Sequence, residues 1–212
     1  MENVKKSYYE NGNIKSEYHY KNDKLHRDNG PAIIRYNENG NIENEYYYKN
    51  NELHRNNGPA IIRYYENGNI KEEWWYKNDK CYRDDGPAII RYHENGNIRE
   101  EYWYKNGEYH RDNGPAIIYY YQNGNIESEY WHKNDKLHRD NEQPAIIHYY
   151  ENGNIKNKYY YKNNKLHKNN GPAIIRYNEN QNIINQEFYL NGKEMDELMI
   201  LILQQSINEE AN

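Results

Sequence analysis

The chain has 212 residues, a formal net charge of −5 and a pI of about 6.0. This charge provides no global positive field for a phosphate backbone, so nucleic acid is a poor candidate partner. Ile, Leu, Val and Phe make up roughly one-sixth of the residues, a fraction usually typical of disorder. The 27 tyrosines argue against disorder, because a tyrosine ring can bury its face while its hydroxyl stays in water.

The prolines mark an internal repeat. They follow one another at a spacing of 28 residues, with one spacing of 29, and an Ala-Ile-Ile segment follows each of them. Asn-Gly pairs recur at a fixed distance after this segment. Prolines and Asn-Gly pairs at such regular spacing indicate one supersecondary unit copied about seven times. The prolines are Pro31, Pro59, Pro87, Pro115, Pro144 and Pro172.

The chain begins with a truncated repeat at residues 1–7, which we expect to be an end strand. Within a repeat, segments such as 60–65 and 70–76 are rich in β-branched and aromatic residues, and Asn67-Gly68 lies between them. Asn-Gly accepts the positive φ angles of a tight turn, so each repeat is predicted to form an antiparallel hairpin. A second turn is expected at Asn78-Asp79. Complete repeats span 8–35, 36–63, 64–91, 92–119, 120–148 and 149–176, and a partial seventh begins at Tyr177.

The hairpin turn fixes a predicted register between the two strands. This register brings opposite charges together and packs an isoleucine on an aromatic ring. Aromatic residues then lie on both faces of the sheet. We therefore expect an all-β fold, an elongated and twisted antiparallel β-hairpin array over residues 1–192. The predicted pairs are Tyr64 with Lys71, Arg63 with Glu72, Ile61 with Trp74, and Ala60 with Trp75.

Residues 193–212 differ from the array, because acidic residues precede an apolar run and turn residues are missing. Acidic residues suit the positive end of a helix dipole, so we predict a C-terminal α-helix of about three turns. It is too short to cross a bilayer and is expected to cap the last strand. Its apolar residues also allow a homodimer contact. The candidate self-association residues are Met195, Leu198, Met199, Ile200, Ile202 and Leu203.

One aromatic column is the best candidate for partner binding. It is the middle position of the aromatic triplet in successive repeats, and Glu and Lys flank it along each strand. Such a stripe between charged columns is typical of a surface that binds a protein strand, a glycan or a lipid headgroup. The competing interpretation is that the rings only cover the sheet, since alanines lie opposite them. We define the aromatic stripe as Tyr47, Trp75, Trp103, Trp131 and Tyr160.

Other polar columns are interpreted as structural. Histidines at equivalent positions of successive repeats lie about 9.5 Å apart, whereas zinc needs its ligands within about 2.1 Å of one ion. His26-Arg27-Asp28 resembles a kinase catalytic loop, but the required Asn is replaced by Ile33 and no glycine-rich phosphate loop is present. We expect no catalytic residue, no metal site and no cofactor. The histidine column is His26, His54, His110, His138 and His167.

A lysine column and a single cysteine complete the candidates. Glu columns beside the lysines largely neutralise them, so a solvated face is favoured over binding of anionic lipid. Cys81 stands where other repeats have Leu, and it is interpreted as a small buried hydrophobe. No disulfide, Asn-x-Ser/Thr sequon or signal segment is apparent, which favours an intracellular location. The lysines include Lys77, Lys105, Lys133 and Lys162.

The string from Leu137 to Ile147 combines Leu-His-Arg-Asp with Pro-Ala-Ile-Ile, and Tyr149 and Asn152-Gly153 follow. This pattern resembles the variant repeat of the membrane occupation and recognition nexus (MORN) family over roughly residues 8–192. The resemblance implies a β-hairpin array with a scaffold or interaction role. The repeats are longer than the usual repeat of that family, and Trp-x-x-Gly is mostly lost to Asn-Asp or Asn-Asn, which argues against inherited lipid binding.

Close relatives of the pattern occur in repeat proteins of bacteria, phages and giant DNA viruses of amoebae, and some bacterial members carry an antitoxin label. Asn, Lys, Ile and Tyr are abundant here, which suits an AT-rich genome. The resemblance and this bias together suggest a giant-virus repeat protein. Its expected location is the host cytoplasm or the virion.

The leading hypothesis is a non-enzymatic repeat scaffold that binds another protein through its extended aromatic sheet. A catalytic site normally needs one asymmetric polar cluster, and the repeats supply none. A module that binds a glycan, a small molecule or a lipid surface is the first alternative, and it requires an exposed stripe. An antitoxin-like protein is a further alternative. An enzyme would need a deep pocket that holds dissimilar titratable groups.

Overall fold

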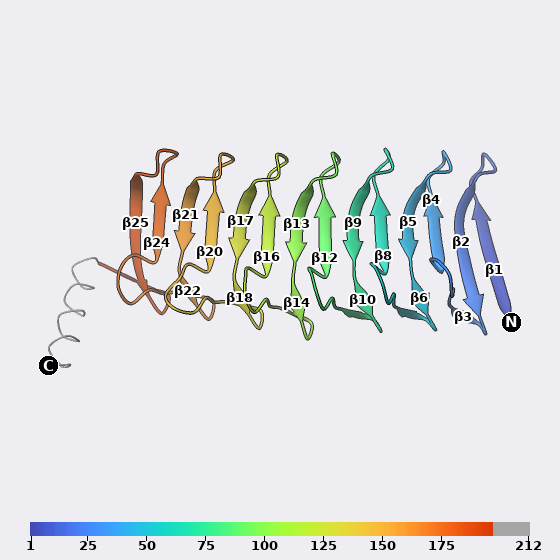
Figure 1. Cartoon of the computed structure of the whole chain (residues 1–212), viewed down its shortest axis with the longest axis horizontal. Coiled ribbons are helices and arrows are strands. Elements are labelled where there is room, and N and C mark those ends of the chain that lie inside the picture. The colour runs from blue at the N-terminus through green and yellow to red at the C-terminus, as the bar shows by residue number, and fades with distance from the viewer. Residues whose placement is uncertain (197–212) are drawn as a thin grey trace. The chain divides into compact units, whose positions relative to one another are not determined.

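The computed structural model describes residues 1–196. The chain divides into two compact units, residues 1–107 and residues 108–212, and each is described here by itself. Every regular element within residues 1–196 is a β-strand, and consecutive strands form antiparallel hairpins (Figure 1). The prediction of an all-β hairpin array is therefore confirmed.

The N-terminal unit contains one main sheet with the strand order β1-β2-β4-β5-β8-β9-β12-β13. The short pairs β6–β7 and β10–β11 lie beyond one end of the main strands, and β3 pairs with β2. The strands are β1 (Glu2–Tyr8), β2 (Ile14–Lys21), β3 (Lys24–Leu25), β4 (Ile33–Tyr36), β5 (Ile42–Tyr46), β6 (Tyr48–Lys49), β7 (Glu52–Leu53), β8 (Ile61–Tyr64), β9 (Ile70–Trp74), β10 (Tyr76–Lys77), β11 (Lys80–Cys81), β12 (Ile89–Tyr92), β13 (Ile98–Tyr102) and β14 (Tyr104–Lys105).

The C-terminal unit repeats this plan with the order β16-β17-β20-β21-β24-β25-β26 and the short pairs β18–β19 and β22–β23. The strands are β15 (Glu108–Tyr109), β16 (Ile117–Tyr120), β17 (Ile126–Tyr130), β18 (His132–Lys133), β19 (Lys136–Leu137), β20 (Ile146–Tyr149), β21 (Ile155–Tyr159), β22 (Tyr161–Lys162), β23 (Lys165–Leu166), β24 (Ile174–Tyr177), β25 (Ile183–Leu190) and β26 (Lys193–Met195).

The tip of each long hairpin from β1–β2 to β20–β21 is a tight turn built on Asn-Gly, and Gln181 takes the place of the glycine between β24 and β25. Between β8 and β9, the N–H of Gly68 donates to the carbonyl of Tyr65 at 3.0 Å, and the N–H of Tyr65 donates to the carbonyl of Asn69 at 2.8 Å. The side chain of Asn67 accepts the N–H of Asn69 at 2.9 Å. Gly68 has a φ of +85°, a left-handed conformation that glycine adopts without a Cβ clash. The predicted turn is confirmed.

The second predicted turn closes the short hairpin β10–β11. Asn78 and Asp79 have φ angles of +51° and +58°. Two consecutive positive φ angles define a two-residue hairpin loop, which Asn and Asp tolerate better than most residues. Counted from the alanine of one Ala-Ile-Ile segment to the residue before the next such alanine, as in 60–87, each repeat therefore consists of a long hairpin, a short hairpin and a loop that leads to the next core strand.

The predicted register holds over most of the long hairpin. Ile61 pairs with Trp74, and Arg63 pairs with Glu72. An isoleucine thus packs against an indole, and opposite charges meet across the strands. These two predicted pairs are confirmed.

The register prediction is wrong next to the turn. Tyr64 pairs with Ile70 and not with Lys71, because a β-bulge between Arg63 and Tyr64 shifts the register. A bulge inserts one extra residue on one strand, so the partner moves by one position. The same shift occurs in other long hairpins, such as β4–β5 and β20–β21.

The predicted pair of Ala60 with Trp75 is also wrong. The N–H of Ala60 donates to the carbonyl of Trp74 at 2.8 Å, whereas the N–H of Trp75 donates to the carbonyl of Ala88 at 2.8 Å. Trp75 is therefore bonded to the following repeat. A stripe residue connects two repeats through its backbone.

The Ala-Ile-Ile segments form the core. Ala60 is fully buried, and Ile61 and Ile62 are 7% and 8% exposed. Adjacent strand residues point to opposite faces, so both faces of the sheet are covered at this level. A cluster of Tyr160, Ala173 and Ile175 shows the same packing at the end of the array.

The predicted C-terminal helix lies almost wholly outside the described residues. Lys193–Met195, which we assigned to the start of the helical segment, instead form β26 and pair with the end of β25. The strands therefore continue past residue 192, where we placed the end of the array. None of residues 1–196 forms a helix long and apolar enough to cross a membrane.

Candidate partner-binding surface

A loop cation covers the ring of four stripe residues, Tyr47, Trp75, Trp131 and Tyr160. The guanidinium carbon of Arg55 lies 3.8 Å from the ring centroid of Tyr47, and that of Arg83 lies 4.2 Å from a ring centroid of Trp75. The ring quadrupole attracts a cation at this distance. In the C-terminal unit, Arg139 covers Trp131 at 3.8 Å and Lys168 covers Tyr160 at 3.8 Å.

A Gly-Pro pair makes room for this cation after every loop but that of Arg139, where Gln143 precedes Pro144. A Cβ at Gly86 would lie 2.6 Å from the guanidinium carbon of Arg83, which is closer than side-chain atoms approach. The guanidinium also donates a hydrogen bond to the carbonyl of Pro87 at 3.4 Å. Arg83 is therefore held by a ring, a glycine and a proline carbonyl. The recurring Arg-x-x-Gly-Pro pattern encodes the shape of the loop.

The histidine column connects successive repeats. Nδ1 of His26 accepts the N–H of Asn50 at 3.2 Å, and Nε2 lies 2.9 Å from Oδ1 of Asp28. Because Nδ1 is an acceptor, Nε2 carries the proton and donates to the carboxylate. His54 lies 2.7 Å from Oδ1 of Asn78 in the next repeat. The predicted structural role is confirmed for these two histidines.

Grooves separate successive loops. In the N-terminal unit, a groove of about 390 Å³ is lined by residues from 26–30, 47–49 and 54–57. The next groove, of about 480 Å³, is lined by residues from 55–58, 75–77 and 82–85. Equivalent grooves of about 550 and 220 Å³ lie in the C-terminal unit. Each of these four grooves is lined by one stripe residue, loop cations and a lysine.

The groove walls carry both signs of charge. Nζ of Lys21 lies 2.6 Å from Oδ2 of Asp28, and Nζ of Lys133 lies 3.1 Å from Oδ2 of Asp140. Hydrogen bonds from Lys21 and His26 lower the pKa of Asp28 to about 2. These carboxylates stay ionised at neutral pH. The grooves therefore offer paired charges rather than a field of one sign.

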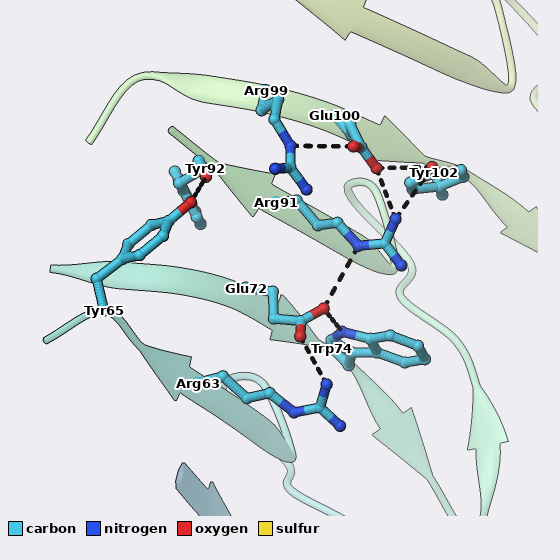
Figure 2. Close-up of polar contacts among 9 residues, drawn as sticks. All are labelled: Arg63, Tyr65, Glu72, Trp74, Arg91, Tyr92, Arg99, Glu100 and Tyr102. Atoms are coloured by element: carbon cyan, nitrogen blue, oxygen red, sulfur yellow. Dashed lines mark hydrogen bonds and ion pairs between the residues drawn. The ribbon is translucent and has the colours of Figure 1, made fainter. Parts of the chain in front are cut away.

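The opposite sheet face of the N-terminal unit carries a network of ion pairs, which Figure 2 shows. Glu72 accepts a hydrogen bond from Arg63 at 2.7 Å and another from the indole of Trp74 at 2.8 Å. Arg91 of the next repeat approaches the same carboxylate at 3.4 Å. Burial raises the pKa of Glu72, but these hydrogen bonds and charges outweigh burial, so its pKa lies below the usual value.

The network continues into the next hairpin. Arg91 donates to Glu100 at 2.6 Å, and the hydroxyl of Tyr102 donates to the same carboxylate at 2.7 Å. Nε of Arg99 lies 3.0 Å from Glu100. Figure 2 shows that Arg91 of β12 faces Glu100 and Tyr102 of the neighbouring strand β13. The charges on this face are therefore engaged within the protein.

Side chains near the Asn-Gly turns also form hydrogen bonds from one repeat to the next. The hydroxyl of Tyr65 donates to the carbonyl of Tyr92 at 2.7 Å, and the side-chain amide of Asn69 donates to the carbonyl of Glu94 at 2.9 Å (Figure 2 shows the tyrosine pair). Tyr9, Tyr121 and Tyr150 make the same bond to Tyr36, Tyr149 and Tyr177.

The structure places the predicted site residues as follows. Tyr47, Trp75, Trp103 and Trp131 are half-buried, and Tyr160 is buried at 8% exposure. All of these except Trp103 line the grooves described above. Among the self-association candidates, Met195 is half-buried in β26. Leu198, Met199, Ile200, Ile202 and Leu203 lie outside the described residues.

Sequence reasoning missed the loop cations as members of this surface. The signal was present, because a cation stands four residues before nearly every proline of the repeat. No group of three or more His, Cys, Asp or Glu side chains within residues 1–196 could hold a metal ion. The missed cations are Arg55, Arg83, Arg139 and Lys168.

Five segments of the chain match the family model of the MORN repeat variant, namely residues 1–22, 33–50, 61–78, 89–106 and 146–163. The array is therefore MORN-like over these repeats. Strands β16–β17 and β24–β25 lie outside the match but form the same long hairpin. None of the curated proteins matches the chain. The predicted viral origin stays a prediction, since the family match carries no information about source.

Proposed function

We propose that this MORN-like repeat array is a non-enzymatic scaffold that binds another protein along its row of grooves. The observation that carries this proposal is the recurrence of the groove at the same place in successive repeats. A surface that repeats along the array suits a partner that crosses several repeats. An enzyme would concentrate its functional groups in one place.

The side chains with shifted pKa values are distributed as expected for a scaffold. Tyr64 donates to Glu45 at 3.0 Å, and Tyr92 donates to Glu73 at 2.7 Å. Burial and then the carboxylate raise the pKa of both tyrosines. The same pair recurs as Tyr149 with Glu129. Perturbed groups that recur once per repeat stabilise the array, whereas a catalytic site brings dissimilar groups together.

The spacing and chemistry of the grooves favour an extended peptide segment. Equivalent points in successive repeats are two strand spacings apart, about 9.5 Å, and three residues of an extended peptide span about 10 Å. The walls present exposed charges of both signs, such as Lys49, Lys77 and Asp84. A partner with polar side chains at every third position fits this pattern.

Charge reversal on the groove walls tests the proposal. The groove variant carries Lys49→Glu and Lys77→Glu in one chain. The control variant carries Lys15→Glu and Lys71→Glu. The control lysines are also exposed, but they lie near the turns, and the total charge change is the same. Proteins captured from an extract of the native host are quantified by mass spectrometry for both variants and for the unmodified chain.

The groove variant is expected to capture at least about tenfold less partner protein than the unmodified chain, while the control variant captures the same amount as the unmodified chain. Equal capture by both variants would contradict the proposal. The exposed lysines also make an anionic membrane surface a second candidate. If the groove variant instead loses sedimentation with anionic vesicles and shows no protein partner, the second candidate replaces the first.

A further inference from the structure

The two ends of the array present strand edges that lack a partner among the described residues. β1 pairs only with β2. β25 pairs with β24, and β26 covers β25 only from Phe188 onward. Inside the units, the second strand of a repeat pairs with the first strand of the next, as in β5–β8, β9–β12 and β17–β20. The first half of β25 lacks this neighbour (Figure 1).

We propose that the chain associates end to end, with the free edge of β25 in one copy pairing with the free edge of β1 in a second copy. The existing ladders give the register. Lys5 pairs with Tyr18 as Ile33 pairs with Tyr46, so Lys5 takes the place of that isoleucine. Glu187 pairs with Ile174 and takes the place of Tyr46.

The register brings complementary side chains together. Within a unit, the residue in the place of Tyr46 pairs with the first isoleucine of the next repeat. At the joint between copies, Glu187 therefore faces Lys5, and a carboxylate meets an ammonium group. Val4 takes the alanine place and is 46% exposed. It comes next to Phe188, which takes the place of the stripe residues.

A hydrogen bond between repeats is also reproduced at the joint. Inside the N-terminal unit, the hydroxyl of Tyr64 donates to the carboxylate of Glu45 in the preceding repeat at 3.0 Å. Tyr8 takes the place of Tyr64 and is 59% exposed. Gln186 takes the place of Glu45. The amide oxygen of Gln186 is a matching acceptor for the hydroxyl of Tyr8.

The last turn of one copy and the first turn of the next copy are also complementary. The side-chain amide of Asn13 donates to the carbonyl of Glu38 in the next repeat at 2.8 Å. Asn182, in the last turn, takes the place of Asn13, and Glu10, in the first turn, takes the place of Glu38. The last turn of one copy thus supplies the donor, and the first turn of the next copy supplies the acceptor. The joint continues the contact that already connects repeats.

The lysines of β1 explain why the contact joins opposite ends. Charged residues, especially lysines, usually protect an edge strand from pairing. Lys5 and Lys6 repel a second β1 edge, but Lys5 complements Glu187 of β25. A contact between two different surfaces leaves one of each free, so further copies can add. The inference is independent of the groove proposal.

Charge swapping tests the inference on the full chain. Lys5→Glu and Glu187→Lys each place like charges at the joint. Each variant alone is expected to need at least about a tenfold higher concentration for half-association than the unmodified chain, measured by light scattering across a dilution series. An equimolar mixture of the two variants restores opposite charges at every joint, and its association is expected to return.

Lys71→Glu is the matched control, because this lysine is also exposed and lies 5.7 Å from a tyrosine ring, as Lys5 lies 5.2 Å from one. The control is expected to associate like the unmodified chain. Glu187→Lys also removes an ion pair with Arg176, so circular dichroism checks its fold. If it misfolds, the comparison of Lys5→Glu with Lys71→Glu decides the question.

Two results would overturn the inference. One is an unmodified chain that stays monomeric at every concentration. The other is association of the Lys5→Glu variant at the same concentration as the unmodified chain, which would point to a contact outside β1.

Discussion

The guanidinium of Arg83 lies over the indole of Trp75, with its carbon 4.2 Å from a ring centroid. The cation comes from the loop that follows β11, and the ring comes from the residue between β9 and β10. This contact ties the loop to the sheet and sets the position of the groove wall. Residues such as Arg83 and Trp75, whose repetition in the sequence resembles a functional motif, therefore hold the loops against the sheet.

Gly86→Ala is expected to displace Arg83 from Trp75. The new Cβ would lie 2.6 Å from the guanidinium carbon, so the side chain must move. Because the end of a flexible arginine can shift at little cost, the expected loss is that of the weakened ring contact, about 0.5–1 kcal/mol of unfolding free energy. Urea unfolding followed by tryptophan fluorescence measures the loss. In an Arg83→Ala background the same glycine substitution is expected to cost less, and an equal cost in both backgrounds would contradict the contact.

The sequence predicted the repeat, the hairpins and most of the register. The pair of Arg63 with Glu72 followed from the position of Asn67-Gly68 alone. The shift at Tyr64 did not, because Asn-Gly fits both a two-residue loop and a longer turn that ends in a left-handed glycine. The bulge depends on which turn forms, and local composition does not distinguish them.

The candidate surface was predicted in part. The stripe was identified from its column, and most of its members do line grooves. The covering of Trp75 by Arg83 was missed, because it depends on how the loop after Cys81 folds back onto the sheet. Long-range packing of a loop has no periodic signal of its own. The Arg-x-x-Gly-Pro spacing was the only indication in the sequence.

Glu72→Gln is expected to destabilise the N-terminal unit and to change its acid sensitivity. Hydrogen bonds to a charged group contribute about 1.5–3 kcal/mol. The pKa of Glu72 is lowered in the folded state, so its contribution is complete above the unfolded value of 4.5. The contribution is lost as the pH falls from there through the lower folded pKa.

Unfolding midpoints between pH 7 and pH 3 measure this effect. The unmodified chain is expected to lose more stability below pH 4.5 than the Glu72→Gln variant. Glu66→Gln is a suitable control, since that carboxylate is exposed in a turn. If the unfolding midpoint of Glu72→Gln falls with pH as steeply as that of the unmodified chain, the network does not depend on this charge.

Cys81 is expected to react slowly with thiol reagents. Burial raises its pKa from 9.0 to about 11, so the thiolate fraction at pH 8 falls about a hundredfold. Labelling with a chromogenic disulfide at pH 8 is expected to be at least that much slower in the folded chain than in urea. Equal rates in both conditions would show that the thiol is open to solvent.

Tyr65→Phe is expected to weaken the contact between two repeats. It removes the hydrogen bond of 2.7 Å to the carbonyl of Tyr92, at a cost of about 0.5–1.5 kcal/mol. Tyr82→Phe is the control, because the hydroxyl of Tyr82 bonds to Asp84 within its own loop. Hydrogen exchange of the amides near both turns compares the variants. Faster exchange is expected only for Tyr65→Phe, and identical exchange in both variants would argue against the ladder of tyrosines.

Photo-crosslinking tests the scaffold function most directly. A photoreactive residue is placed at Asn56 or at Asp84, which line the grooves, and at Glu66, which lies in a turn on the far end of the strands. All three positions are exposed. After illumination in the native host cell, both groove positions are expected to capture the same partner protein, and Glu66 is expected to capture none. Capture of that partner from Glu66 but from neither groove position would contradict the account.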